Sequence, residues 1–267
     1  MQKINLLNPK QSEVKFEIIN FPDGEPHLKF IGELDRKDEY QVDCRITNPT
    51  DLFVVCQVAD ILDRLSVKWK LRIYYLMSMR MDRVISFNES FSLKVVANML
   101  NSFDPYEVEI LEPHSQRTID EIYSSKPMAA VTSIDFSNFI VVFPDKGAKE
   151  RYSDLKCSNY VVTCNKVRDP NTGQLLSFEI TNPEVIEKAP AEMQFVVIDD
   201  LCDGGGTFVG IANLLKNYNR KRNIFVTHLV NEKGIKNLCE NYDFVSVTNS
   251  YKDWKSDYKN FHVIRIV

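Results

Sequence analysis

Short apolar runs alternate with amphipathic segments along most of the chain. The runs are rich in β-branched and aromatic residues, which is typical of buried strands. They predict strands at 14–20, 27–30, 72–76, 108–111, 139–143, 160–163, 195–198, 224–227, 244–247 and 263–267. Segments between them repeat apolar residues at the spacing of one helical face, and predict helices at 51–66, 92–101, 118–123, 148–155, 208–215 and 234–240.

Alternating strands and helices indicate an α/β fold with mainly parallel sheets. The pattern restarts near residues 132–138, and 267 residues are enough for two domains of ordinary size. We therefore predict an N-terminal domain at 1–133 and a C-terminal domain at 134–267.

The most informative stretch is 195–215, where a buried strand enters a glycine-rich loop and then a helix. Asp199 and Asp200 follow the strand, and three consecutive glycines precede the helix. Backbone N–H groups and the helix dipole at such a junction favour an anion such as phosphate. The paired acids would repel phosphate, so they suit ribose hydroxyls or Mg²⁺ instead. The plainer alternative is a left-handed turn with solvated acids.

A second strand, 139–143, ends in Pro144-Asp145-Lys146-Gly147-Ala148 and enters another predicted helix. This is a candidate second anion loop, although a surface turn with a capping aspartate would read the same way. Lys166 and Arg168 follow the next strand and are either phosphate ligands or a solvated basic face.

Three further segments carry candidate chemistry. His114 ends the strand 108–111, where imidazole could contact a metal or a phosphate. Arg80 and Asp82 follow the strand 72–76, and ligands bind at such strand ends in parallel sheets. The segment Phe21-Pro22-Asp23-Gly24-Glu25 is by itself an ordinary turn.

Taken together and in order, these segments resemble the ribose-phosphate diphosphokinase (phosphoribosyl pyrophosphate synthetase) family. The resemblance covers nearly the whole chain, through Phe-x-Asp-Gly-Glu, Arg-x-Asp, the strand-end His, Pro-Asp-x-Gly-Ala, Lys-x-Arg and Asp-Asp-x-x-Asp-x-Gly-Gly-Thr. It implies two tandem type I phosphoribosyltransferase-like domains related by a pseudo-twofold axis, and a homodimer or larger homo-oligomer.

The resemblance also assigns roles. It implies ATP binding by Phe21, Asp23, Glu25, Arg80 and Asp82, with the first three reaching a neighbouring subunit. It implies diphosphate binding by Asp145, Lys146, Gly147 and Ala148, catalysis by Lys166, Arg168 and His114, and Mg²⁺ near His114 and Asp145. Ribose-phosphate binding is implied for Asp199, Asp200, Asp203, Gly204, Gly205, Gly206 and Thr207.

The implied reaction transfers the β,γ-diphosphate of ATP to the 1-hydroxyl of a ribose phosphate and releases AMP. The acceptor stays open, because Gly204 stands where the family has Thr and the missing side chain leaves room beside the phosphate. Ribose 5-phosphate and ADP-ribose, as used by relatives that rebuild NAD⁺, are both compatible. A non-catalytic regulatory homologue and a phosphoribosyltransferase are the alternatives from other functional classes.

Amino-acid composition bears on nucleic-acid binding, membrane insertion and disulfide formation. The net charge is −4 and the pI about 5.7, so no basic footprint for nucleic acid is present. No apolar run reaches the ~18 residues of a membrane span. Six cysteines are scattered without a Cys-x-x-Cys pair, which favours reduced thiols in a cytoplasmic protein.

Overall fold

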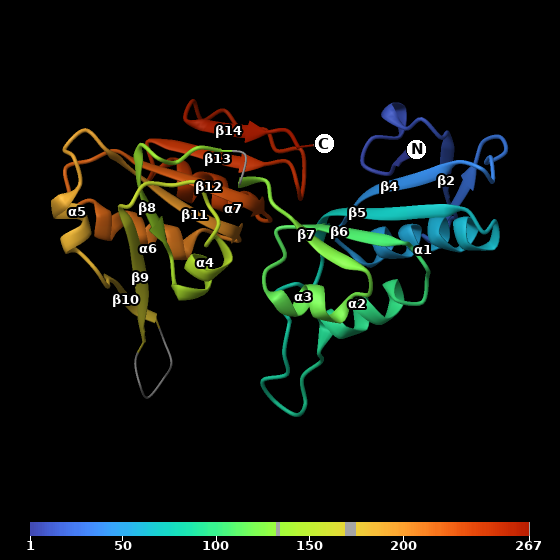
Figure 1. The fold of residues 1–267 in the computed structure, drawn as a ribbon, viewed down its shortest axis with the longest axis horizontal. Coiled ribbons are helices and arrows are strands. Elements are labelled where there is room, and N and C mark those ends of the chain that lie inside the picture. Colours follow the sequence, from blue (N-terminus) through green and yellow to red (C-terminus); the bar gives the residue numbers. More distant parts are fainter. Residues whose placement is uncertain (132–133, 169–174, 267) are drawn as a thin grey trace. The chain divides into compact units, whose positions relative to one another are not determined.

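The computed structural model describes residues 1–131, 134–168 and 175–266, and the side chains of 167, 168, 175 and 176 are not described. The chain divides into two compact units, Met1–Ala129 and Ala130–Val267 (Figure 1). Each unit has its own sheet and its own buried core, so each is described by itself.

The first unit is built on a five-stranded sheet in the order β1-β4-β5-β6-β7, with every neighbouring pair parallel. Its strands are β1 (Gln2–Asn5), β4 (Glu39–Ile46), β5 (Lys68–Leu76), β6 (Glu107–Leu111) and β7 (Ser125–Met128). Its helices are η1 (Pro9–Gln11), α1 (Pro49–Arg64), α2 (Ser92–Leu100) and α3 (Gln116–Glu121).

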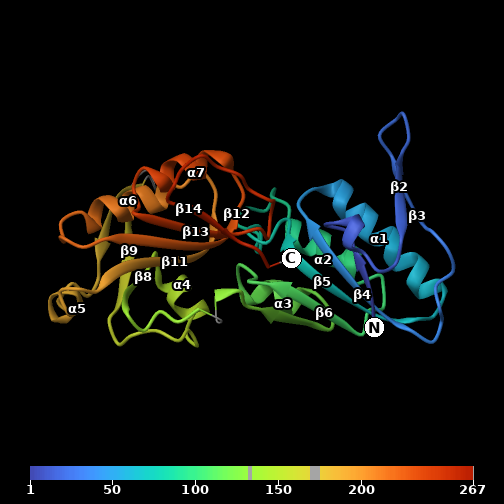
Figure 2. The ribbon, with the colours of Figure 1, turned by 90° about the horizontal axis from the view of Figure 1, so that it is seen from above.

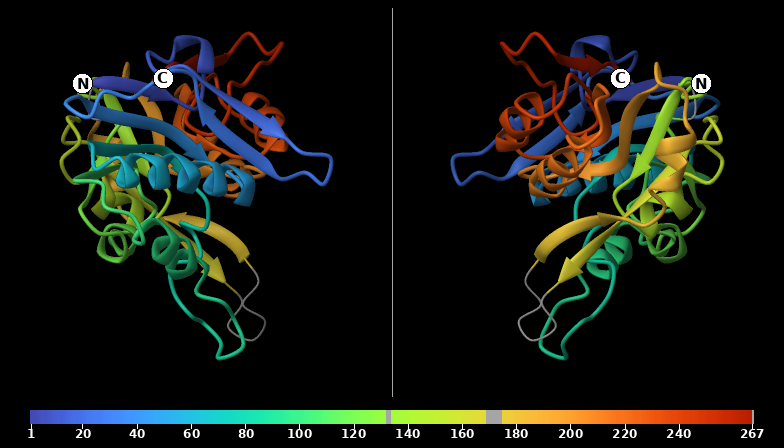
Figure 3. Two further views of the ribbon diagram at one scale, coloured as in Figure 1. Left: turned by 90° about the vertical axis from the view of Figure 1, so that its right-hand side faces the viewer. Right: turned by 90° about the vertical axis from the view of Figure 1, so that its left-hand side faces the viewer.

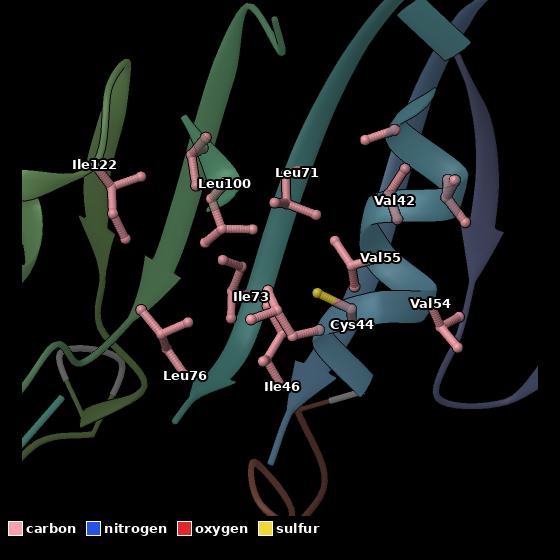
Figure 4. Packing of buried hydrophobic residues seen from close by; sticks show 14 of the residues in the cluster. Val42, Cys44, Ile46, Val54, Val55, Leu71, Ile73, Leu76, Leu100 and Ile122 are labelled. Atoms are coloured by element: carbon pink, nitrogen blue, oxygen red, sulfur yellow. The ribbon is translucent and has the colours of Figure 1, made fainter. Parts of the chain in front are cut away.

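Helix α1 shows how local sequence shapes this unit. The Asn48 side chain caps the helix by accepting a hydrogen bond from the Asp51 N–H at 3.0 Å, and Pro49 suits the first turn. The face of α1 turned to the sheet buries Leu52, Val54, Val55, Val58, Ala59 and Leu62. These side chains pack on Val42, Leu71 and neighbouring strand residues (Figure 4). Each large side chain so buried contributes roughly 1.5–3 kcal/mol.

Strands β2 (Phe16–Asn20) and β3 (Pro26–Phe30) form a separate antiparallel ribbon. The ribbon is anchored at its base, where Leu28 is buried and its N–H donates to Gln57 Oε1 at 2.7 Å. Its far end projects from the sheet of the first unit (Figures 2 and 3). Ile18, Ile19 and Phe21 are 37%, 42% and 46% exposed, so the ribbon presents apolar surface to solvent.

The second unit is built on a seven-stranded sheet in the order β10-β9-β8-β11-β12-β13-β14. Its strands are β8 (Phe139–Phe143), β9 (Val161–Arg168), β10 (Leu175–Ile180), β11 (Gln194–Cys202), β12 (Arg222–Leu229), β13 (Phe244–Thr248) and β14 (Phe261–Ile264). All neighbouring pairs are parallel except β9 and β10. Its helices are α4 (Lys146–Arg151), α5 (Glu184–Lys188), α6 (Gly206–Leu215) and α7 (Glu232–Cys239).

This sheet is covered on both faces. Helices α6 and α7 lie on one face, and α4 lies on the other (Figure 2). Val197 and Val142 belong to the core under α6 and α7, whereas the adjacent Val196 and Val141 belong to the core under α4. Strands buried on both faces read as continuous apolar runs, as 139–143 and 195–198 do.

The predicted α/β class with mainly parallel sheets is confirmed. Strands β1, β4, β7 and β10 were not predicted. Strand β4 is an inner strand of the first sheet, between β1 and β5, and its buried polar residues Gln41 and Asp43 interrupt the apolar run. The pseudo-twofold relation of the domains stays a prediction. No helix in the described part of the chain combines the length and apolarity needed to cross a bilayer.

Candidate functional site

Two predicted loops leave the same edge of the second sheet. Strands β8 and β11 are parallel neighbours, so their carboxyl ends lie side by side. Residues 145–148, the diphosphate loop, follow β8, and residues 199–207, the sugar-phosphate loop, begin at the end of β11. The topology therefore brings together two segments that are about fifty residues apart in the sequence, the kind of strand-end crevice where open α/β sheets bind ligands.

The sugar-phosphate loop begins inside the sheet. Strand β11 runs to Cys202, beyond the predicted end at 198, so Asp199 and Asp200 lie within the strand, where Asp199 pairs with Val226 of β12. The chain then turns through 203–205 and enters α6 at Gly206, with Thr207 as its second residue. Asp203, the glycines and Thr207 thus lie where a strand passes into the N-terminus of a ten-residue helix.

Only one of the three glycines in this loop is required by backbone conformation. Gly205 caps α6 with φ +83°, in the left-handed region that glycine adopts freely. A Cβ placed on Gly204 or on Gly206 would meet no atom within 4 Å. The fold itself would tolerate side chains at these two positions, so the space beside them is open to a ligand.

The diphosphate loop is organised by Asp145. Its Oδ1 accepts a hydrogen bond from the Ala148 N–H at 3.0 Å and caps the short helix α4. Lys146 is exposed and lies 3.6 Å from Glu150 one turn on, and Ala148 is buried. The capping turn proposed as the plainer alternative is therefore present, and it leaves Asp145 Oδ2 for a second partner.

That second partner is Lys166, whose Nζ lies 3.3 Å from Asp145 Oδ2. Lys166 is carried by β9, the sheet neighbour of β8, and 30% of its side chain is exposed. The backbone of Arg168 ends the same strand, but its side chain lies outside the described part of the structure. The predicted cation at 166 therefore faces the diphosphate loop.

Arg151, which sequence reasoning missed, links the two loops. Its guanidinium, at the end of α4, lies 2.7 Å from Asp200 Oδ1 and 3.3 Å from Asp199 Oδ1. Its side chain is 20% exposed, and that of Asp200 only 2%. Arg151 sits six residues after Asp145, inside the predicted helix 148–155 and at the end of the observed α4. A basic residue in that position was visible in the sequence, but nothing there showed that it faces the acid pair.

The acid pair has an unusual electrostatic environment. Burial, together with the neighbouring Asp200 carboxylate, raises the pKa of Asp199 well above its ordinary value of 3.8, although Arg151 acts in the opposite direction. The side chain of Asp199 is 17% exposed. Among the described ion pairs, the two acids share the Arg151 guanidinium.

The first unit brings together two other predicted residues. Asp82 is buried, and it accepts hydrogen bonds from Arg83 Nε at 2.8 Å and Nη2 at 3.2 Å. The Arg83 guanidinium chiefly, aided by Ser115 and by the His114 charge, holds the pKa of Asp82 below its ordinary value of 3.8. Asp82 and His114 are therefore close, at the carboxyl ends of the parallel neighbours β5 and β6.

The other predicted ATP-binding residues are exposed. Arg80 lies on the surface after β5. Phe21, Asp23 and Glu25 form the tip of the β2–β3 ribbon, where the Glu25 N–H donates to Asp23 Oδ1 at 3.1 Å. The Phe21 ring lies 6.2 Å from the His27 ring, centroid to centroid. The structure places these residues where a ligand or another chain can reach them, and their roles stay predictions.

The described residues include no cluster of three or more His, Cys, Asp or Glu side chains that could by itself hold a metal ion. His114 belongs to the first unit and Asp145 to the second. A divalent cation would therefore depend on oxygens from a ligand. Mg²⁺ normally binds in this way, with one or two carboxylates, several waters and substrate phosphates.

Comparison with known proteins identifies relatives along most of the chain. No protein-family model matches it. A ribose-phosphate pyrophosphokinase of Pyrococcus furiosus is 27% identical over 259 residues, which cover 88% of this chain and 85% of the relative. A ribose-phosphate pyrophosphokinase of Mycoplasma genitalium is 26% identical over 273 residues, covering 95% of this chain and 80% of the relative.

The fold agrees with these sequence matches. The crystal structure of phosphoribosylpyrophosphate synthetase from Mycobacterium smegmatis matches with a TM-score of 0.74, over 97% of this chain and 88% of that chain, at 18% identity. The expected architecture of two tandem phosphoribosyltransferase-like domains is consistent with this match. The chain is thus similar in sequence to ribose-phosphate pyrophosphokinases and similar in fold to a phosphoribosylpyrophosphate synthetase.

Proposed function

We propose that the protein transfers the β,γ-diphosphate of ATP to the 1-hydroxyl of a ribose phosphate and releases AMP. Relatives that carry the name ribose-phosphate pyrophosphokinase, matched over most of their own length, support this reaction. One structural observation carries it. The diphosphate loop and the sugar-phosphate loop leave adjacent strand ends and are tied together by Arg151 and its contacts with Asp199 and Asp200.

The sugar-phosphate loop is the proposed binding site of the acceptor. Asp199 and Asp200 would accept hydrogen bonds from the vicinal ribose hydroxyls, and Arg151 keeps both carboxylates in place. Residues 203–207 would bind the 5-phosphate through backbone N–H groups at the start of α6. The 1-hydroxyl would then point to the diphosphate loop, beside Asp145.

Three cationic side chains, those of Lys166, Arg168 and His114, are the proposed catalytic groups. Diphosphate transfer depends mainly on positioning and on neutralising the charge of the phosphate oxygens in the transition state. Lys166 already lies 3.3 Å from Asp145, so a small rotation would carry its ammonium group to an incoming phosphate. Arg168 is the second proposed cation, and His114, from the first unit, the third. Phe21, Asp23, Glu25, Arg80 and Asp82 are the proposed ATP ligands.

We propose Mg²⁺ as the cofactor, entering as the ATP complex. Bound there, it would neutralise phosphate charge and orient the diphosphate for attack. Asp145 and His114 are the side chains that would hold it, and their carboxylate and imidazole groups suit a site completed by phosphate oxygens and water. The Asp145 carboxylate would then bind Mg²⁺ in place of the Lys166 ammonium group.

The acceptor is either ribose 5-phosphate or ADP-ribose. The open space beside Gly204, where a Cβ would meet nothing within 4 Å, could admit a phosphate with a second substituent. A Gly204→Thr variant separates the two acceptors, because the added side chain would fill that space. With ADP-ribose as acceptor, the variant should lose most of its activity. With ribose 5-phosphate, it should keep activity within a few-fold.

The deciding experiment measures AMP and the diphosphorylated sugar by ³¹P NMR, using ATP, Mg²⁺ and each acceptor separately. The wild-type protein should form both products in equal amounts with one acceptor. The Lys166→Ala variant should lose roughly 10²–10³-fold in kcat, the usual effect of removing one group that stabilises transition-state charge. Lys156→Ala is the control, because Lys156 is exposed and pairs only with Asp135 among its described ion-pair partners.

Other products would point to the alternatives. ATP binding without AMP formation, in wild type and variant alike, would favour a regulatory homologue. Free diphosphate formed from phosphoribosyl pyrophosphate and a nucleobase would favour a phosphoribosyltransferase.

We also propose that the protein works as a homodimer or larger homo-oligomer. The exposed apolar side chains of the β2–β3 ribbon support this proposal, because apolar surface gathered on one projecting element is suited to burial against a second copy of the chain. Sedimentation analysis of the wild type and of an Ile19→Lys variant tests it. The variant should dissociate at concentrations at which the wild type stays assembled.

A further inference from the structure

Helix α7 packs closely against the turn of the sugar-phosphate loop. Three of its residues make the contact, the capping residue Asn231 and, inside the helix, Gly234 and Asn237. None of the three was predicted to belong to the site. Each meets the loop at a different atom, and together they fix how its peptide groups are oriented.

Gly234 allows the loop to approach the helix backbone. A Cβ at this position would lie 2.5 Å from the Asp203 carbonyl oxygen and 2.8 Å from Leu229 Cδ1. Gly234 has no left-handed φ, and glycine weakens a helix relative to alanine. Close packing against the loop is therefore the reason for a glycine here.

Asn237 holds the next peptide group. Its Nδ2 donates a hydrogen bond to the Gly204 carbonyl oxygen at 2.6 Å. In a trans peptide, the C=O and the following N–H point in opposite directions. Because the carbonyls of Asp203 and Gly204 both face α7, the N–H groups of Gly204 and Gly205 point away from it. Successive N–H groups aimed to one side form an anion-binding nest.

Asn231 restrains the one acidic side chain of the turn. Its Nδ2 donates to Asp203 Oδ1 at 2.9 Å, while its own Oδ1 accepts from the Lys233 N–H at 3.0 Å and caps α7. One amide group thus ties the start of α7 to the Asp203 carboxylate. This carboxylate would repel a phosphate if it swung into the nest.

We propose that α7 positions the phosphate-binding nest, with Gly234 and Asn237 as positioning residues that never touch the substrate. The proposal rests on the proposed function of the sugar-phosphate loop. It assigns the affinity for the sugar phosphate partly to a helix that follows the next strand, rather than to the loop sequence alone.

The test compares half-buried Asn237, inside α7, with half-buried Asn241, just after the helix ends. Asn237→Ala removes the hydrogen bond to Gly204, whereas Asn241→Ala removes a hydrogen bond to the Asn237 carbonyl one turn further on. Asn237→Ala should raise the KM for the sugar phosphate roughly fivefold to tenfold, the effect of one lost hydrogen bond, and leave kcat and the KM for ATP within twofold. Asn237→Asp should lose more, because a carboxylate oxygen would face the carbonyl oxygen.

Binding is also measured without turnover, by calorimetric titration with ribose 5-phosphate and with inorganic phosphate. For Asn237→Ala and for Gly234→Ala, the Kd for ribose 5-phosphate should rise by the same factor as that variant's KM for the sugar phosphate. Asn241→Ala should bind as the wild type does. Wild-type affinity in Asn237→Ala, equal weakening in Asn241→Ala, or no phosphate binding by the wild type would each overturn the proposal. A wild type that binds phosphate but forms no AMP would refute the proposed reaction only, because the titration still tests α7.

Discussion

At the scale of single residues, the main feature of this site is the ion pairing of two neighbouring acids with one arginine. Asp199 and Asp200 share one guanidinium, that of Arg151, at distances of 3.3 and 2.7 Å. Burial and the neighbouring acid raise the pKa of Asp199, so keeping it ionised costs folding free energy. Function, rather than stability, is the reason to keep two acids here.

Asp199→Asn should therefore stabilise the protein at neutral pH, by roughly 1 kcal/mol or more. The pKa of Asp199 is raised in the folded state, so its ionisation opposes folding only above the ordinary value of 3.8. The stability gain should thus be absent near pH 3.5 and grow as the pH rises. Urea unfolding of both proteins across that range measures it. A gain that is equal at all pH values would show that charge is not the cause.

Arg220 is the residue on which the α5 segment depends most. Its guanidinium donates to the carbonyls of Ile186, Ala189, Pro190 and Met193, at the end of α5 and in the turn that follows. Arg220→Ala should lower the free energy of unfolding by about 2–3 kcal/mol, because several half-buried carbonyls lose a charged donor at once. Lys221→Ala, at the exposed next position, should change it by less than ~0.5 kcal/mol. Equal losses in thermal unfolding would contradict this role.

At the scale of elements, close contacts at glycines determine how helices lie on the second sheet. A Cβ on Gly210, in α6, would lie 2.3 Å from the Phe178 ring. Phe178 belongs to β10 and pairs in register with Lys166 of β9. The Phe178–Gly210 contact therefore anchors the strand pair that carries the proposed catalytic lysine.

Gly210→Ala should destabilise the protein by about 1–3 kcal/mol through overpacking, although alanine favours an isolated helix. Leucine is smaller than phenylalanine, so the double variant Gly210→Ala/Phe178→Leu should regain part of the lost stability. Denaturant unfolding of the single and double variants gives the coupling energy. Simple additivity of the two effects would show that the two residues do not act through this contact.

At the scale of the whole molecule, each unit contains a complete core. The buried cluster of the first unit runs from Ile4 to Ile122, and the two clusters of the second run from Val131 to Trp254. Among the described strands, neither sheet includes one from the other unit. Independent cores of this kind are what allow domains to fold separately.

A fragment of residues 130–267 should therefore fold cooperatively when expressed alone. It should bind ribose 5-phosphate, because both loops and α7 lie within it, but it should form no AMP, because the proposed ATP ligands lie in the first unit. Thermal unfolding followed by circular dichroism tests the cooperative folding, and calorimetric titration tests the binding of ribose 5-phosphate. A non-cooperative melt would show that the second unit needs the first.

Local sequence was enough to predict the alternation of strands and helices and the strand–loop–helix junction at Asp145. It also predicted the junction after β11, although that strand runs to Cys202, past its predicted end at 198. These features follow from local patterns, namely apolar runs, glycine clusters and the residues that end strands. Strand β4 was within reach of the same reasoning, since Tyr40, Val42, Cys44 and Ile46 alternate with polar residues. What the alternation does not predict is that the polar residues Gln41 and Asp43 are buried as well.

The distant residues that complete the site could be found only from the folded structure. Arg151 meets the acid pair because β8 and β11 are neighbours in the sheet, and Asn237 meets Gly204 because α7 packs beside the start of α6. An arginine, an asparagine or a glycine in a helix has no local signature for such a contact. Strand order and helix packing are set by burial summed over the whole unit, so no short stretch of sequence contains that information.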